Sequence, residues 1–214
     1  MTLYDLISPP DRYPRQVPVM GVVPAIVTNN EDPDGLGRVR LKFPWLNDDA
    51  ESHWARIATP MAGADRGFFM LPEMGDEVLV GFEHADPRRP VVLGALWNGE
   101  DGPPGENSNG ENNLRFIKSR SGHTILLDDT DGGEQIVITD KDEKNFIRIN
   151  VAEGNLEITA DADITISAPN GTLKLECKDL ELTASSSAKL TSGGDGDIEA
   201  SGTLNIQGST VNIN

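Results

Sequence analysis

The residues best suited to acid–base or nucleophilic chemistry are few and lie far apart. The three histidines, His53, His84 and His123, are separated in the sequence and have no partner histidine nearby. The single cysteine, Cys177, also has no histidine close to it, which favours a packing or surface role over that of a nucleophile. One cysteine excludes an internal disulfide framework and a cysteine-rich zinc site. These residue types therefore predict no catalytic residue.

Three acidic segments offer chemistry of another kind. Residues 128–133 read Asp-Asp-Thr-Asp-Gly-Gly, but no register supplies the ligand pattern of an EF-hand loop, so a turn is the favoured interpretation. Residues 193–198 resemble half of a calcium-binding β-roll repeat with its aspartate one position early, which leaves calcium as the lesser alternative. Asp161 and Asp163 could act as a carboxylate pair on a sugar, but their alternation with alanine and isoleucine favours a solvated strand. We expect no metal site and no cofactor.

Charge and hydropathy exclude several classes of protein. The 214 residues include 18 Lys and Arg against 35 Asp and Glu, which gives a net charge of −17. Binding to nucleic acid depends on neutralising phosphates, so a chain this acidic is expected to have no nucleic-acid partner. No run approaches the ~20 apolar residues that span a bilayer. Residues 1–15 contain no lysine and no apolar core, so they are not expected to be a secretory signal.

The chain consists of two parts with different compositions. Of the 14 prolines, only Pro169 follows Pro104, and all three tryptophans lie in the first half. The break falls in residues 99–113, a polar stretch rich in Gly, Pro and Asn that is typical of a linker. A linker this short leaves no room for an inserted enzyme domain.

The first part is expected to form a small β-barrel. Turn sequences such as Asp32-Pro33-Asp34-Gly35 separate five segments of high strand propensity, which cover residues 22–27, 38–43, 54–58, 77–82 and 91–97. Five strands without a clear helix fit an OB-type barrel. Because aromatic side chains bury large areas, we expect them to supply most of its core.

The second part repeats a short pattern of two apolar residues at positions i and i+2. Gly, Asn, Asp, Ser and Thr fill the intervals, so each pair predicts one short strand with two side chains on one face, and each interval a tight corner. This pattern is typical of a β-helix. The pairs are Ile125/Leu127, Ile136/Ile138, Ile147/Ile149, Leu156/Ile158, Ile164/Ile166, Leu173/Leu175, Leu180/Leu182, Ala188/Leu190, Ile198/Ala200, Leu204/Ile206 and Val211/Ile213.

The repeats favour a homotrimer. From Leu156 onward no aromatic residue is available to fill a wide interior, and a lone copy would expose an apolar stripe and unpaired strand edges. Three copies that each contribute one strand to every level of a narrow prism would bury the apolar stripe and pair the strand edges. The alternative that stays open is a single-chain solenoid.

Five motifs follow one another along the chain and carry a family resemblance. They span Asp32–Trp45, Trp54–Gly63, Leu71–Glu83, Asp86–Gly94 and Ile117–Thr124. The first four closely resemble the OB domain of VgrG and phage baseplate protein V spikes, and the fifth resembles the entry to that family's β-helix. The resemblance implies an all-β protein with an N-terminal OB-fold barrel and a C-terminal triple-stranded intertwined β-helix in a homotrimer. The expected boundaries are an arm over 1–20, the OB domain over 21–98, the linker over 99–113 and the needle over 114–214.

The resemblance also implies a function. The family forms the central spike of contractile injection machines, so the OB domain is expected to dock to a trimeric baseplate hub and the needle to puncture the target envelope, without enzymatic activity. With about 20 residues before the OB domain, the chain resembles the separate phage-type spike rather than the form fused to its hub. The resemblance places the protein in the baseplate of a phage tail or tail-like particle, which is assembled in the cytoplasm of the producing cell. Arg88 and Arg89 are either a basic hub-binding spot or solvated turn residues. The alternatives are a carbohydrate-active or carbohydrate-binding β-helix protein and an OB-fold nucleic-acid binder.

The last residues of the sequence suggest a tip partner. Some family needles hold iron with a His-x-His motif near the tip, and no histidine follows His123 here. Family members often carry a PAAR-type tip protein instead, and strand edges with apolar ends invite such a partner. The expected contact residues are Thr210, Val211, Asn212, Ile213 and Asn214. The alternative is a tip left uncapped, with the asparagines solvating it.

Overall fold

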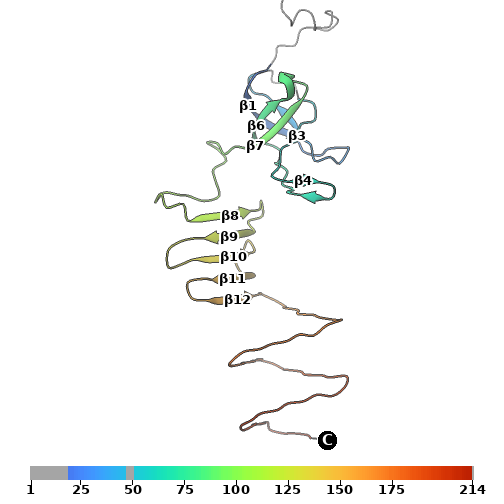
Figure 1. The fold of residues 1–214 in the computed structure, drawn as a ribbon, viewed down its shortest axis with the longest axis vertical. Helices are drawn as coiled ribbons and strands as arrows, with labels where there is room; N and C mark the ends of the chain where they lie inside the picture. Colours follow the sequence, from blue (N-terminus) through green and yellow to red (C-terminus); the bar gives the residue numbers. More distant parts are fainter. Residues whose placement is uncertain (1–18, 47–50, 214) are drawn as a thin grey trace, which may run out of the picture. The chain divides into compact units, whose positions relative to one another are not determined.

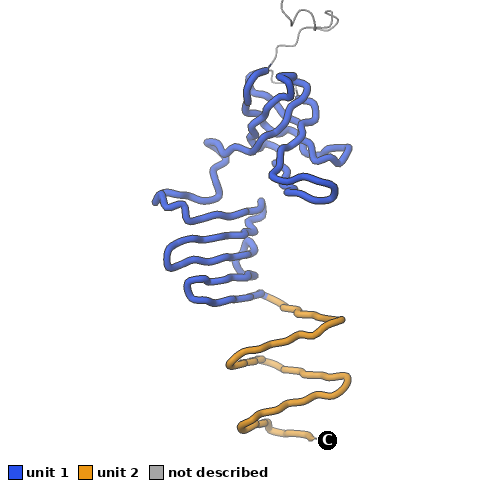
Figure 2. Tube along the Cα trace, in the orientation of Figure 1, with its two compact units in different colours: residues 1–161 blue, residues 162–214 orange. Residues whose placement is uncertain are grey.

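A computed structural model describes residues 19–46 and 51–213 of the chain. Of the predicted arm over 1–20, only Val19 and Met20 are therefore described. The predicted tip residue Asn214 also lies outside the described residues. The chain divides into two units, residues 1–161 and 162–214 (Figure 2). No helix in the described ranges is long and apolar enough to cross a membrane.

Five strands of the first unit curl into an OB-like sheet (Figure 1). Their order is β2-β1-β6-β7-β3, and only the β3–β7 pair is parallel. Just before the two outer strands, an isolated bridge joins Val39 and Ala55, with N···O distances of 3.0 and 2.8 Å. The strands are β1 (Val22–Asn29), β2 (Arg40–Lys42), β3 (Arg56–Ile57), β6 (Glu77–Phe82) and β7 (Pro90–Ala95). The prediction of a five-stranded OB-like sheet is confirmed.

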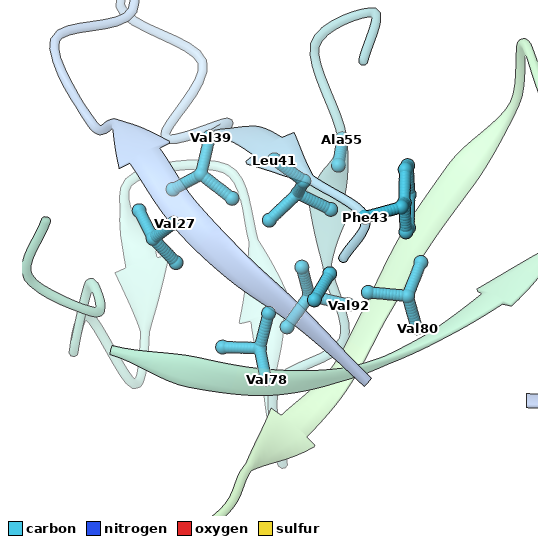
Figure 3. Close-up of a cluster of buried hydrophobic side chains, with 9 residues drawn as sticks. Val27, Val39, Leu41, Phe43, Ala55, Val78, Val80 and Val92 are labelled. Carbon is cyan, nitrogen blue, oxygen red and sulfur yellow. The ribbon is translucent and has the colours of Figure 1, made fainter. Parts of the chain in front are cut away.

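The core of this sheet consists mainly of valine. In β6, Val78 and Val80 alternate with more exposed residues, as a strand with one buried face requires. The buried set is Ala25, Val27, Val39, Leu41, Phe43, Ala55, Val78, Val80 and Val92 (Figure 3). The expectation of a mainly aromatic core was wrong, because Phe43 is the only aromatic member of that set and Trp45 and Trp97 are exposed. A small curled sheet leaves an interior that β-branched side chains can fill.

A short hairpin between β3 and β6 was not predicted. It pairs β4 (Ala62–Gly63) with β5 (Arg66–Gly67), two residues each, which is too short for an alternating pattern to reveal. Gly67 has a φ of 152°, and a Cβ there would lie 2.5 Å from the carbonyl oxygen of Met61. Glycine is therefore required where the hairpin returns. A three-residue 3₁₀ turn, η1 (Glu83–Ala85), joins β6 to the loop before β7.

The rest of the first unit is an antiparallel meander, which we call the self-paired sheet. Its order, β12-β11-β10-β9-β8, is the reverse of the chain order, so every strand pairs with its sequence neighbours (Figure 1). The strands are β8 (Leu114–Lys118), β9 (Thr124–Asp128), β10 (Gln135–Thr139), β11 (Phe146–Asn150) and β12 (Asn155–Thr159). The sequence predicted strands here but assigned their hydrogen bonds to other copies of the chain. The structure shows these bonds within one chain.

The second unit, residues 162–214, contains no assigned strand in its described part. Figure 2 shows it as extended passes joined by reversals. Between its described residues the only backbone hydrogen bond joins the Gly171 N–H to the Ala168 carbonyl, at 3.2 Å. The repeat leucines and isoleucines are exposed, from 52% at Leu204 to 90% at Leu190. This unit has the sequence pattern of strands without the partners that strands need.

Candidate functional site

The Asp32–Arg38 loop between β1 and β2 is held by one carboxylate. The side chain of Asp32, 3% exposed, accepts bonds from the Arg38 Nη2 and Nε atoms at 2.7 and 2.8 Å. It also accepts backbone N–H bonds from residues 34, 36 and 38 at 3.1 to 3.2 Å. The Arg38 side-chain bond, followed by these N–H bonds, holds the pKa of Asp32 well below its usual range. The motif therefore positions the loop and leaves this carboxylate no free role in catalysis.

Trp54 lies beside the same loop. The Arg38 and Arg40 guanidinium carbons lie 5.8 and 5.0 Å from the centroid of its ring, which is the range of cation–π contacts. Arg40 is also paired with Glu51, with a Nη1 to Oε2 distance of 3.1 Å. The resembling motifs around residues 32–45 and 54–63 thus meet in one structural cluster.

We expect Asp32→Asn to lower the melting temperature, and the loss to depend on pH. The folded-state pKa of Asp32 is depressed, so its stabilising effect is present above the unfolded-state pKa of about 3.9 and is lost as pH falls below it. The difference between wild type and variant should be constant from about pH 7 to 5 and shrink below about pH 4. Thermal unfolding across this range measures it. Asp34→Asn, at a carboxylate that is 67% exposed, is the control and should have a smaller effect. An equal loss at all pH values would contradict the assignment.

The two arginines considered for hub binding are already paired. Arg88 bonds Asp86 through Nη2 at 2.8 Å and Nε at 3.0 Å, and this interaction lowers the pKa of Asp86 to about 2. Arg89 lies 4.0 Å from Glu83, which also pairs with Arg56. The local charge is therefore largely balanced, which favours the interpretation as solvated turn residues.

An exposed apolar surface surrounds the β4–β5 hairpin and was missed in the sequence. The apolar side chains of this surface line one open groove of about 1030 Å³, and among them Phe69 is 79% exposed. Exposed apolar patches of this kind mark interaction surfaces. The run Gly67-Phe68-Phe69-Met70, apolar without strand alternation, was the available signal. We call this surface the apolar hairpin patch, and it consists of Leu36, Met61, Phe68, Phe69 and Met70.

The structure brings none of the other chemical candidates together. His53, His84, His123 and Cys177 are all exposed, and the described residues contain no group of three or more His, Cys, Asp or Glu placed to hold a metal ion. Asp161 pairs with Lys144 at 3.2 Å, and nothing links it to Asp163.

Of the two suspected calcium segments, the first is a turn and the second is a bend held by a side-chain hydrogen bond. In residues 128–133, the Asp128 carboxylate accepts bonds from the Thr130 N–H and hydroxyl at 3.0 and 2.6 Å, which lowers the pKa of Asp128. The Gly133 N–H bonds the Thr130 carbonyl at 2.8 Å, so the segment folds as the predicted turn. In residues 193–198, Ser192 donates its hydroxyl to the Asp195 carbonyl at 2.9 Å.

The proposed tip residues can be placed in part. Residues 210–213 are exposed, with Val211 at 48% and Ile213 at 87%, and Asn214 lies beyond the described range. No backbone hydrogen bond from another described strand reaches them. They present an apolar surface and free backbone groups.

The curled sheet defines the class of the first domain. Residues 23–97 match the family described as the Type VI secretion system/phage-baseplate injector OB domain. Residues 23–97 are therefore an OB domain of the phage baseplate V/VgrG type, as the motifs suggested.

Individual relatives point the same way. The chain is 30% identical over 126 residues to the Type VI secretion system spike protein VgrG1a of Pseudomonas aeruginosa, and 34% identical over 145 residues to spike protein VgrG5 of the same organism. These matches cover 53% and 61% of this chain but only 20% and 18% of the relatives. A match to the actin cross-linking toxin VgrG1 of Vibrio cholerae is 35% identical over 75 residues, covering 33% of this chain and 7% of the toxin. The chain thus spans a fifth or less of the length of these relatives.

The two spike-protein matches extend beyond the OB domain. The family segment, residues 23–97, is 75 positions long and makes up about a third of the 214-residue chain. Matches that cover 53% and 61% of the chain must therefore include residues outside it. The similarity to spike proteins includes part of the arm, linker or repeat region.

Proposed function

We propose that the protein is the central spike of a contractile injection machine, a phage tail or a related particle, and acts as a homotrimer. The OB domain docks to a baseplate hub, and the repeat region forms a trimeric β-helix, intertwined over residues 162–213, that punctures the target envelope. The family of the OB domain and the relatives named as spike proteins support this role. In this role the protein works mechanically rather than as an enzyme.

The observation that carries the proposal is the state of residues 162–213. They repeat the apolar pairs of strands but make almost no backbone hydrogen bonds within their own chain. Backbone N–H and C=O groups that will be buried need partners, and the described part of the same chain supplies almost none, so we assign these partners to other copies. Three identical copies, intertwined, pair these edges and bury the exposed leucines and isoleucines. Bending such a prism would require many hydrogen bonds to break together, which gives the needle its stiffness.

We assign hub docking to the apolar hairpin patch. It is an exposed apolar surface on the domain that matches injector OB domains, and Phe69 and Met70 are 79% and 61% exposed within it. The arginine alternative is weaker because Arg88 is bound to Asp86. The carbohydrate-binding alternative lacks aromatic platforms, because Phe116 and Phe146 are the only aromatic residues from position 114 onward.

The mass of the native particle tests the proposal. Three copies of the 23.1 kDa chain have a mass of about 69 kDa, which native mass spectrometry or light scattering of the purified protein measures directly. We expect this species to dominate. A stable 23 kDa monomer would contradict the trimer and favour a single-chain solenoid.

A separate tip protein is the second partner that we propose. It would cap Thr210 to Asn214 of all three chains, where the exposed Val211 and Ile213 offer apolar contact and the free strand edges offer backbone pairing. Co-purification with a PAAR-type protein of the same system is the expected result, and deletion of residues 209–214 should abolish it. Binding that survives the deletion would place the partner elsewhere.

A further inference from the structure

The two faces of the self-paired sheet differ in chemistry. Directly paired residues of an antiparallel sheet lie on the same face, and the register pairs Ile136 with Leu127 and Ile149. The pairing continues to the outer strands, so all the apolar pairs from β9 to β12 lie on one face. We call it the isoleucine face. Its apolar members are Ile117, Ile125, Leu127, Ile136, Ile138, Ile147, Ile149, Leu156 and Ile158, each between 37% and 65% exposed.

The opposite face is closed by its own side chains. Val137 at its centre is only 8% exposed. Around it Arg148 pairs with Glu157 at 3.1 Å and lies 4.5 Å from the Phe146 ring. Thr139 and Gln135 also lie on this face. It therefore resembles a solvated outer surface, whereas the isoleucine face has no charged member in β9 to β12 and needs a cover.

The self-paired sheet and the second unit depend on other chains to different degrees. Every strand of the sheet is paired with a sequence neighbour, so the sheet forms through local contacts, which form fast. Residues 162–213 have no sheet partner among the described residues 19–46 and 51–213, so we infer that they form a sheet only when other copies arrive. The apolar pairs nevertheless run from one region into the next, from Leu156/Ile158 to Ile164/Ile166. The same apolar pattern thus runs through two regions, one whose strands pair within the chain and one whose strands do not.

The later repeats cannot set their own register. Their pairs start at residues 164, 173, 180, 188, 198, 204 and 211, with similar residues and similar intervals. Chains shifted by one repeat would still place apolar pairs against apolar pairs. Strand register is weakly specified wherever the alternative alignments bury the same kind of side chain. A separate element must therefore align the three chains.

We propose that the self-paired sheet is the trimerisation seed of the spike. Three sheets pack through their isoleucine faces, one as each wall of a prism, and this contact brings residue 161 of the three chains to one level before residues 162–213 pair. The occupant of each isoleucine face is thus a second and a third copy of this chain. This proposal rests on the homotrimer proposed above and adds the surface that forms first and the order of assembly.

Refolding of the full-length protein tests the order. The denatured chain is returned to native buffer, amides are pulse-labelled with deuterium at increasing times, and protection is read by mass spectrometry. We expect residues 114–159 to gain protection before residues 162–213. Protection of 162–213 first, or of both regions together, would overturn the seed. A wild-type protein that never becomes a trimer would instead overturn the proposed function.

Three single variants of the full-length chain test the surface. Ile138→Asp places a carboxylate on the isoleucine face, and we expect trimer recovery to become at least about tenfold slower, because an unpaired charge must be buried at the contact. Thr139→Asp, one residue along the same strand and on the opposite face, is the matched control and should refold at the wild-type rate. Ile198→Asp should leave the early trimer intact and remove protection only downstream. Equal slowing by Ile138→Asp and Thr139→Asp, or no slowing by either, would overturn the proposal.

Discussion

The Ile164→Asp/Ile166→Asp double variant should run as a monomer on an unheated SDS gel, where the wild-type protein should run as a trimer. Both isoleucines are exposed in the single chain, at 56% and 70%, and both occupy inward positions of the proposed β-helix. Two substitutions in three chains would bury six carboxylates without partners, and each such group costs several kcal/mol. In mild buffer the variant should remain associated through the isoleucine faces, which separates this defect from that of Ile138→Asp.

Thr165 supplies the matched control for this variant. It lies between the two isoleucines, so alternation places it on the outer face. Thr165→Asp adds the same chemical group at the same level and should leave SDS resistance unchanged. A double variant as SDS-resistant as the wild type would show that the inward assignment is wrong, and an SDS-sensitive control would show that the two faces are not distinct.

Leu41→Ala should destabilise the OB domain by about 2–5 kcal/mol, the range for truncating a fully buried leucine. Leu41 is 0% exposed and lies among Val39, Val80 and Ala55 in the core (Figure 3). All three tryptophans belong to the first half of the chain, so tryptophan fluorescence during urea unfolding reports on this domain without interference from the repeats. The unfolding midpoint of the variant should fall clearly below that of the wild type.

Leu36→Ala is the control for this experiment. Leu36 is the same residue type a few positions earlier and is 68% exposed, so its truncation should change the free energy of unfolding by no more than about 0.5 kcal/mol. The trimer should survive both substitutions, because the repeats lie outside the OB domain. Equal midpoints for the two variants would contradict the buried position of Leu41.

The sequence predicted the strands of the OB domain well where they alternate and end in turns. The expected strand over 77–82 coincides with β6, and that over 22–27 lies within β1 (Val22–Asn29). The composition of the core was predicted wrongly. The number of aromatic residues indicates how much area they could bury, but it does not indicate which positions face the interior of the curled sheet. Trp54 stacks beside two arginines instead.

The first four apolar pairs were located correctly, since they fall in β9 to β12, but their pairing was not decided by the pattern. Alternation fixes which residues share a face, and Ile136, Ile138, Ile147 and Ile149 do share one. It does not state which strand donates to which, so the closed hydrogen bonds of β8–β12 within one chain were missed. The β4–β5 hairpin was missed because two-residue strands carry no period. The apolar hairpin patch depends on that hairpin and was missed with it.

The open backbone of residues 162–213 has a consequence for the lifetime of an unassembled copy. An extended chain with free amides and exposed leucines is what a protease cleaves and what another strand edge captures into an aggregate. For each newly made copy, association with two others therefore competes with degradation and aggregation. The steady-state amount of intact chain in the producing cell should rise more than proportionally with its rate of synthesis, because assembly requires each copy to meet two others, whereas cleavage by a protease acts on a single copy.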